Sequence, residues 1–391
     1  MDTIAILRTL VGFDTTSRLS NLPLVHWTVA YLEEHGARIR LSYDDDGRKA
    51  NVLASLGPDR VGGVVLSGHT DVVPIDGQDW NSDPFSLTER GGRLYGRGTA
   101  DMKGFIACCL AAVPALARTP LKRPIHLALS YDEEVGCLGV PRLLANLAAN
   151  VPAPALAIVG EPTGMRIGDR HRGFFGYRTT FHGRAAHSSD PSAGASAIYS
   201  AAEFVRFLRT AGDDSGDGIE RTTFNVGRID GGTAINIVPN RCEVVWEFRP
   251  SAGSDVGAIR TTVDDFMARS VVHDVKFDHA ALTSVPPLAS RNDNAALRLA
   301  HDLGAELPTL AMPFGTEAGF FQAAGIPTVV CGPGSIDQAH QPDEWITVAQ
   351  LEAGSRFIDR LGAWAARKRS FRHDPEKWVP VFRKDHAQTE G

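Results

Sequence analysis

Short apolar segments alternate with segments of helical periodicity along the first 160 residues of this chain, and this alternation constrains the fold more than any other feature. The apolar segments are GGVVLSG (62–68), IHLALSY (125–131) and PALAIVG (154–160). Residues 102–118 and 139–149 between them place apolar side chains at helical spacing. A strand that is apolar on both faces must be covered on both faces. We therefore predict an α/β fold with a mixed, mostly parallel sheet flanked by helices, preceded by helices at 2–12 and 22–37.

The pattern changes after about residue 173. Alternating strand-like segments follow at FFGYRTTFHG (174–183), TTFNVGRID (222–230), CEVVWEFRP (242–250) and DVKFDHAAL (274–282). Helical spacing occurs at 194–211 and 255–269. The order β-α-β-β-α-β is that of the ferredoxin-like unit.

This unit divides the chain into two predicted domains. We expect an inserted α+β domain at 174–285, which interrupts a catalytic domain made of 1–173 and 286–391. The helix and strand alternation resumes after the insertion with a helix at 294–304 and the strand in GIPTVVCGPG (325–334). The last twenty residues are charged and poorly patterned, so the sequence assigns them no role.

Composition excludes several classes of partner. The net charge is −6, with 40 basic residues scattered among 46 acidic ones, so there is no electrostatic footprint for nucleic acid or an anionic membrane. The N-terminal MDTIAILRTLVGF lacks the features of a signal peptide, and the longest apolar run is too short to cross a bilayer. The five cysteines include no C-x-x-C pair. We expect a cytoplasmic protein with a small-molecule substrate.

Imidazoles and carboxylates collect where the predicted strands end. They are His69 and Asp71 after the first strand, Glu133 and Glu134 after the second, Glu161 after the third, His340 after the last, and Asp101 in a glycine-rich loop. Open α/β sheets bind ligands at this edge. So many buried acids would repel one another unless cations lay among them. Oxygen and imidazole ligands without thiolates favour zinc, cobalt or manganese, and two ions fit this set better than one.

Seven segments that contain these residues resemble one known family. They are GHTDVVPIDGQDW, YGRGTADMKG, DEEVGC, GEPT, HGRAAHSS, GGTAINIVP and GTEAGFFQAAGIPTVVCGPGSIDQAHQPDEW. The family is that of the dinuclear zinc hydrolases, which includes aminoacylases, desuccinylases and glutamate carboxypeptidases, and the resemblance covers nearly the whole chain. It implies two divalent metal ions, zinc or cobalt, and an inserted domain that acts as a lid and forms a homodimer.

The resemblance also implies a set of metal ligands. Asp101 would bridge the two ions. His69 and Glu161 would complete one site, and Glu134 and His340 would complete the other.

Two further carboxylates receive catalytic roles. Asp71 would hydrogen-bond the His69 ring and orient it, as metal-bound imidazoles commonly require. Glu133 would be the general base, because a carboxylate beside a ligand but not itself bound can reach the attacking water. The alternatives are an ordinary turn acid for Asp71 and a surface residue for Glu133.

The remaining candidates would contact substrate. The resemblance implies that His187 reaches into the partner subunit's active site and stabilises the oxyanion, and that Asn236 and Arg249 bind the substrate α-carboxylate. Thr316 and Glu317 precede the strand that leads to His340, so we expect them to line the same pocket, with Glu317 meeting a substrate ammonium group. The alternatives are that His187 is an ordinary exposed loop histidine, that Arg249 caps a strand edge, and that Glu317 bonds to local backbone amides and shapes its own loop.

The function implied is removal of the acetyl group from N2-acetyl-L-ornithine in arginine biosynthesis, by a metal-bridging hydroxide with Glu133 as base. Other N-acyl amino acids, such as N-acetylcitrulline, N-formyl or N-succinyl amino acids, and dipeptides present the same amide beside a carboxylate, so they remain alternatives. A catalytically inactive homologue that binds metals or amino acids is a further alternative, although such a protein would not need Glu133.

Overall fold

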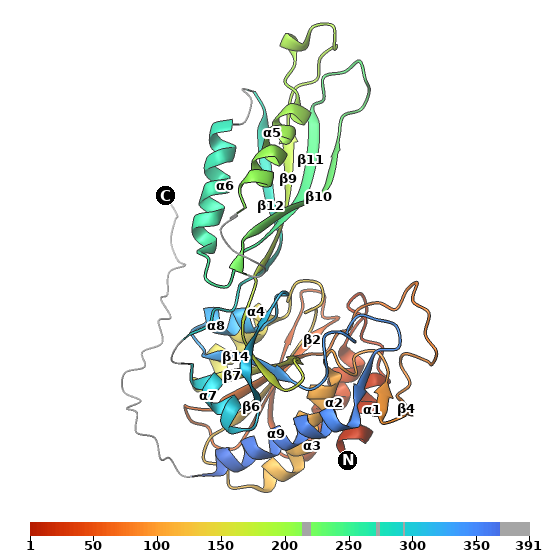
Figure 1. Ribbon diagram of the computed structural model, residues 1–391, viewed down its shortest axis with the longest axis vertical. Coiled ribbons are helices and arrows are strands. Elements are labelled where there is room, and N and C mark those ends of the chain that lie inside the picture. Colours follow the sequence, from red (N-terminus) through yellow and green to blue (C-terminus); the bar gives the residue numbers. More distant parts are fainter. Residues whose placement is uncertain (213–219, 271–273, 292–293, 368–391) are drawn as a thin grey trace.

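The computed structural model describes residues 1–212, 220–270, 274–291 and 294–367. Two parts are joined at a narrow waist, a larger helix-covered part and a smaller elongated one (Figure 1). The predicted tail region, the last twenty residues, lies outside the described residues. No helix in the described ranges is long and apolar enough to cross a membrane.

The larger part, which we call the main domain, is built on an eight-stranded sheet. Its strands are β1 (Arg38–Tyr43), β2 (Ala50–Leu56), β3 (Val64–His69), β6 (Ile125–Ser130), β7 (Leu156–Pro162), β8 (Arg166–His171), β13 (Glu306–Met312) and β14 (Thr328–Gly332). The order across the sheet is β1-β2-β6-β3-β7-β14-β8-β13. The four central strands β6, β3, β7 and β14 are mutually parallel, which confirms the predicted mixed, mostly parallel sheet.

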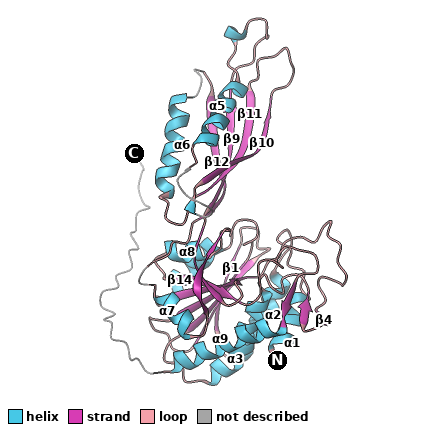
Figure 2. Cartoon of the chain, viewed as in Figure 1, coloured by secondary structure: helices cyan, strands magenta, loops and turns pink. Residues whose placement is uncertain are grey.

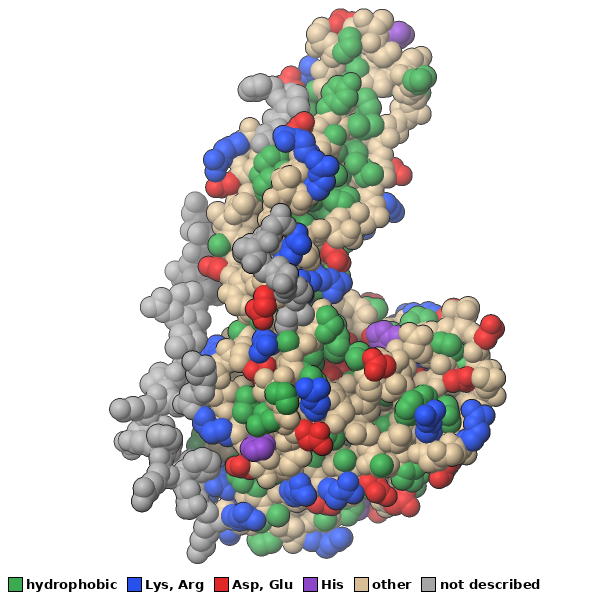
Figure 3. Space-filling view, viewed as in Figure 1, with side chains coloured by type: hydrophobic (Ala, Val, Ile, Leu, Met, Phe, Trp, Pro, Cys, Tyr) green, Lys and Arg blue, Asp and Glu red, His purple; other side chains and the backbone are tan. Residues whose placement is uncertain are grey.

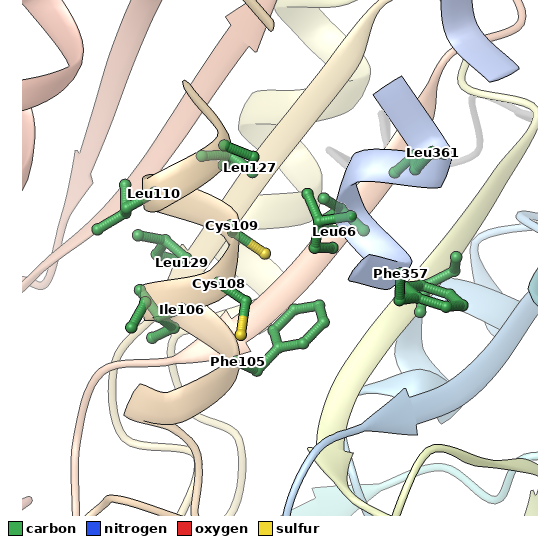
Figure 4. Packing of buried hydrophobic residues seen from close by; sticks show 14 of the residues in the cluster. Leu66, Phe105, Ile106, Cys108, Cys109, Leu110, Leu127, Leu129, Phe357 and Leu361 are labelled. Atoms are coloured by element: carbon green, nitrogen blue, oxygen red, sulfur yellow. The ribbon is translucent and has the colours of Figure 1, made fainter. Parts of the chain in front are cut away.

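Helices cover both faces of this sheet. They are α1 (Thr3–Val11), α2 (Leu22–Glu34), α3 (Lys103–Arg118), α4 (Val140–Asn150), α7 (Ala295–Asp302), α8 (Ala318–Ala323) and α9 (Val348–Ala366). Alternate residues of β3 point to opposite faces, so Val64 and Leu66 join the core beneath α1, α3 and α9, and Val65 joins the core beneath α4 and α8. The side chains of Cys108 and Cys109 in α3 pack in the first of these cores between the sheet and α9 (Figure 4).

The smaller part, the inserted domain, is a four-stranded antiparallel sheet with two helices on one face (Figure 2). Its elements are β9 (Phe174–His182), α5 (Ala197–Thr210), β10 (Thr223–Gly231), β11 (Arg241–Arg249), α6 (Val256–Ser270) and β12 (Lys276–Val285), with a 3-10 turn at Pro191–Ala193. The strand order β10-β11-β9-β12 is that of the ferredoxin-like unit. We propose Phe174 and Val285, where β9 begins and β12 ends, as the limits of this domain.

Some local features differ from what periodicity predicts. A three-stranded sheet of β4 (Thr88–Arg90), β5 (Arg93–Tyr95) and β15 (Trp345–Thr347) joins segments 250 residues apart, so no local pattern predicts it.

The first two helices begin differently. Asp2 caps α1, because its side chain accepts a hydrogen bond from the Ala5 amide. Asn21 stands at the same position of α2 but makes no such bond, because its side chain pairs instead with the Ala50 backbone.

Candidate metal centre

The parallel central strands end at one edge of the main-domain sheet, and the predicted ligands lie there. His69 is the last residue of β3, Glu161 is the second-last of β7, and Glu133 and Glu134 follow β6 by three and four residues. A hollow separates the two domains, with histidine and acidic side chains on the main-domain wall (Figure 3). The loop that carries Glu133 and Glu134 lies against the inserted domain, since a Cβ at Gly136 would clash with Thr283 of β12.

Asp101 occupies the centre of the cluster. It lies in the loop that leads into α3, and its side chain is 7 % exposed. Its Oδ1 atom is 3.0 Å from Nε2 of His69, and its Oδ2 atom is 3.3 Å from Nε2 of His340. The two oxygens of one carboxylate thus face two different imidazoles, which is the geometry that a bridging ligand requires.

The remaining carboxylates lie on either side of Asp101. Glu161 Oε2 is 3.9 Å from Nε2 of His69, and Glu134 Oε2 is 3.0 Å from Nε2 of His340. Potential ligand atoms of His69, Asp101 and Glu134 lie within 4.8 Å of one another, and so do those of His69, Glu133 and Glu161. Glu133 therefore lies close enough to serve as a ligand or as a base.

The protonation behaviour of the cluster follows from burial and crowding. Burial and the nearby Asp101 charge raise the pKa of Glu134 to about 7, and the same two effects raise that of Glu161 well above its usual range. Burial raises the pKa of Asp101, but its hydrogen bonds with His340 and His69 outweigh this effect and lower it. Hydrogen bonds with Asp101 and Glu134 raise the pKa of His340 to about 10.

The cationic groups that face the crowded acids are the imidazoles of His69 and His340. Within the part of the chain that the structure describes, neither Lys nor Arg forms an ion pair with Asp101, Glu133, Glu134 or Glu161. Two imidazoles and four carboxylates in one largely buried cluster, in which the His340 side chain is 49 % exposed, are a donor set that suits divalent cations. The residues present therefore fit a metal centre.

Asp71 contributes differently from the prediction. The His69 Nδ1 atom donates to the main-chain carbonyl of Asp71 at 2.9 Å, whereas the nearest Asp71 carboxylate oxygen is 3.6 Å away. The carboxylate instead accepts the backbone amides of Glu133 and Glu134 at 3.1 and 3.3 Å and the hydroxyl of Ser17 at 2.7 Å. Asp71 thus orients the His69 ring with its backbone and holds the Glu133–Glu134 segment with its side chain.

Comparison with known proteins identifies the family. Residues 65–362 match Peptidase family M20/M25/M40. The chain is 35 % identical over 362 residues to an acetylornithine deacetylase of Proteus mirabilis, covering 89 % of this chain and 91 % of the relative. The chain belongs to the M20 family.

Solved M20 structures share its fold. A metallo-carboxypeptidase of Sulfolobus solfataricus aligns with a TM-score of 0.74 at 17 % identity, covering 94 % of this chain and 100 % of that one. The YxeP protein of Bacillus subtilis, described as a dinuclear metal binding peptidase, aligns with a TM-score of 0.66 at 17 % identity, covering 93 % and 97 %.

In this M20 chain, His187 and Asn236 lie together at the far end of the inserted domain. His187 forms a β-bridge with Ile237, and the Ser188 amide donates to the Asn236 carbonyl at 3.0 Å. His187 follows β9 and Asn236 follows β10, and both strands run away from the main domain. Each strand has nine residues, so its far end lies about 30 Å from the junction between the domains. The fold of one chain does not bring either residue to the metal cluster.

Arg249 lies at the opposite end of β11 from Asn236, next to the junction between the domains. Its guanidinium stacks over the ring of Phe174 at 4.6 Å, and Nε donates to Glu247 at 3.0 Å. The length of β11 therefore prevents Arg249 and Asn236 of the same chain from binding one substrate carboxylate together. Both residues were expected to bind the substrate α-carboxylate, and in this chain they lie at opposite ends of β11.

Thr316 and Glu317 are buried inside the main domain and do not line an open pocket. The Thr316 hydroxyl is 3.1 Å from Nε2 of the buried His171. The Glu317 carboxylate is 0 % exposed and accepts the hydroxyls of Ser67, at 2.8 Å, and Ser130. In this structure the carboxylate that was expected to meet a substrate ammonium group bonds instead to Ser67 of β3 and Ser130 of β6, from the residue that directly precedes α8.

Sequence reasoning also missed residues that hold the M20 site together. Ser17 has no metal-binding character, and no motif indicated its bond to Asp71. Glu344 stands in the quoted HQPDEW segment, four residues after His340, and that spacing was the one available signal.

Proposed function

We propose that this chain is a metal-dependent hydrolase that removes the acetyl group from N2-acetyl-L-ornithine to give L-ornithine and acetate, in arginine biosynthesis. The name of the Proteus mirabilis relative, at 35 % identity over most of both chains, supports the substrate. The observation that carries the reaction type is the Asp101 carboxylate, whose two oxygens face His69 and His340. We also propose a cytoplasmic location, which the five buried, unpaired cysteines support.

We propose that the cluster holds two zinc ions, with cobalt as a substitute. His69, Glu161 and Asp101 would hold one, and Asp101, Glu134 and His340 the other. When bound, such a pair acidifies a water molecule and polarises the amide carbonyl. The dinuclear metal binding described for the Bacillus subtilis structure is consistent with this assignment.

Glu133 would act as the general base. It would take a proton from the attacking water and return it to the amide nitrogen as the C–N bond breaks, so that the products are acetate and the free amine. Its position supports this role, because its ligand atom lies within 4.8 Å of those of His69 and Glu161 while the proposed ligand sets are complete without it.

Arg249 would bind the α-carboxylate of the substrate. It lies at the junction of the two domains, and its planar guanidinium matches a carboxylate in a two-bonded pair. Glu317 would support the site from beneath, since its bonds to Ser67 and Ser130 join the start of α8 to β3, which ends at His69, and to the last residue of β6, which Glu133 follows by three residues.

We further propose a homodimer formed through the inserted domain. His187 and Asn236 lie far from the metal cluster of their own chain, and both are exposed at the tip of the inserted domain. A second subunit would allow this tip to reach the other subunit's site, where His187 would stabilise the oxyanion and Asn236 would bind the substrate.

A hydrolysis screen tests the proposed function. N-acyl amino acids would be supplied with zinc or cobalt, and kcat/KM would be measured for N2-acetylornithine, N2-acetylcitrulline, N-formyl and N-succinyl amino acids, and dipeptides. We expect N2-acetylornithine to be preferred, and a higher value for any other substrate would overturn the assignment.

The same assay on Glu317→Gln tests the role of the buried carboxylate. We expect N2-acetylornithine and N2-acetylcitrulline to lose kcat/KM equally. A loss of about 1.5–3 kcal/mol for the cationic substrate alone would instead show a direct contact with its ammonium group.

A further inference from the structure

The carboxylate of Glu344 is buried beneath the loop that carries Asp101. Glu344 is 1 % exposed, and each of its two carboxylate oxygens accepts two hydrogen bonds. The donors are Arg97 Nη1 at 2.8 Å and the Gly98 amide at 2.9 Å to Oε2, and the amides of Ala100 at 2.8 Å and Asp101 at 3.0 Å to Oε1. One side chain therefore gathers three backbone amides and a guanidinium.

This arrangement fixes the backbone of the Asp101 loop. The donor of the last bond is the amide of Asp101 itself, so the position of its Cα, and hence of its carboxylate, depends on Glu344. Gly98 has φ +83 and no room for a Cβ, which would lie 2.8 Å from the Val72 side chain. The loop is thus folded closely around the carboxylate, as backbone amides fold around a bound anion.

The same network reaches the segment that carries His340. Arg97 Nη2 donates to Gln78 Oε1 at 2.6 Å, and the Gln78 amide donates to the His340 carbonyl at 2.9 Å. Arg97 Nη1 also donates to the Gln341 carbonyl at 3.3 Å. Two segments that are 240 residues apart in the chain, each with a proposed ligand, are therefore tied to one buried ion pair.

We propose that Glu344, together with Arg97, is a positioning residue that sets the separation between Asp101 and His340 before a metal ion binds. This inference rests on the metal centre proposed above. Glu344 itself touches neither metal nor substrate. It acts through the backbone of Asp101 and through the chain that leads from His340.

The energetics favour a positioning role over a purely stabilising one. A buried ion pair loses the hydration of both charges, so it often adds little to stability compared with an apolar pair of the same size. Ligand geometry is a different requirement, because a metal site needs its donors held in place by bonded neighbours, and losing such a neighbour costs about 10–100-fold in metal affinity.

The test uses the Glu344→Gln variant of the full chain. Glutamine has about the volume of glutamate, but the NH2 group of its side-chain amide would face two hydrogen-bond donors that a carboxylate oxygen now accepts. Co²⁺ titration of the metal-free protein would give the affinities, and the visible absorption spectrum of bound Co²⁺ would report coordination geometry. We expect affinity to fall at least about tenfold with an altered spectrum. The matched control is Glu352→Gln, at an exposed position of α9, which should leave both unchanged.

The outcomes separate the inference from the proposed function. If the wild-type protein does not bind two Co²⁺ ions, the metal centre itself is wrong. If it does, and Glu344→Gln binds them with wild-type affinity and spectrum, the positioning role is overturned even if the variant melts at a lower temperature. Should Glu344→Gln not fold, Arg97→Lys decides, since lysine keeps the charge but cannot reach Glu344, Gln78 and Gln341 together. We expect weaker Co²⁺ binding in that variant, and wild-type binding would overturn the proposal.

Discussion

Glu133 and Glu134 are neighbours in the chain, but the same substitution should change turnover at one and metal content at the other. In Glu133→Gln we expect both metal ions to remain bound while turnover is nearly lost. In Glu134→Gln we expect the metal content to fall toward one ion per chain. The reason is geometric: Glu134 Oε2 lies 3.0 Å from Nε2 of His340, opposite Asp101, whereas the proposed ligand sets are complete without Glu133.

The magnitudes follow from the two roles. Loss of a general base typically costs about 10²–10⁴ in kcat, or roughly 3–5 kcal/mol in activation free energy. Changes to residues that merely support ligands cost about 10–100-fold in metal affinity, so loss of the Glu134 charge should exceed about 100-fold.

Stability provides a third readout for Glu133→Gln. Burial, Glu134 and Glu317 raise the pKa of Glu133 in the folded protein, so the metal-free fold loses stability as pH rises above the ordinary carboxyl pKa of about 4.3, where the unfolded chain ionises this group and the fold resists its ionisation. Replacing this carboxylate with a neutral amide removes the penalty. The melting temperature of metal-free Glu133→Gln at neutral pH should therefore be no lower than that of the wild type.

The assay combines metal analysis of dialysed protein, kcat at saturating substrate and metal, and thermal melts of the metal-free forms. Loss of metal in Glu133→Gln together with retention of metal in Glu134→Gln would contradict these two roles. Because Glu133 also lies within ligand distance of His69 and Glu161, that outcome would make it a ligand and would reverse the two assignments.

Two further predictions concern assembly and pH. Mixing inactive His187→Ala with inactive Glu133→Ala should restore some turnover through hybrid dimers, and no recovery after confirmed subunit exchange would exclude action across the interface. Burial lowers the pKa of His126 to about 4, with the charge of Arg38 adding to the effect. The unfolded chain, with a histidine pKa near 6.5, therefore binds more protons between pH 6.5 and 4, so stability falls as pH falls through that range, by about 2 kcal/mol at pH 5. Denaturant unfolding at pH 7 and 5 measures this change. The free energy of unfolding of His126→Gln should fall between these pH values by about 2 kcal/mol less than that of the wild type, whereas the exposed His301→Gln should match the wild type. A fall in His126→Gln equal to that of the wild type would contradict the assignment.

The elements that carry the site could be predicted from the sequence. Continuous apolar strands between helices require a sheet covered on both faces, and the carboxyl ends of its parallel strands meet at one edge. His69 and Glu161 could be assigned to that edge because each belongs to a strand visible in the local pattern. The ferredoxin-like order of the inserted domain was equally visible, since each of its strands and helices has its own periodicity.

Where the partners of a side chain are distant in the sequence, its direction became known only from the packed structure. Nothing local distinguishes a Glu317 that faces a substrate from one buried on Ser67 and Ser130, because those serines lie on strands about 250 and 190 residues away. The separation of Asn236 from Arg249 appeared only once β11 had a length and a direction.

The set of hydrogen bonds between Glu344 and the loop that carries Asp101 was the least predictable feature. Glu344 and the amides of Gly98, Ala100 and Asp101 come from segments some 240 residues apart, and backbone amides have no signature in a sequence. Periodicity reports which face of an element is buried. It does not report which buried donor meets which acceptor, because that pairing depends on how the packed elements bring remote segments together.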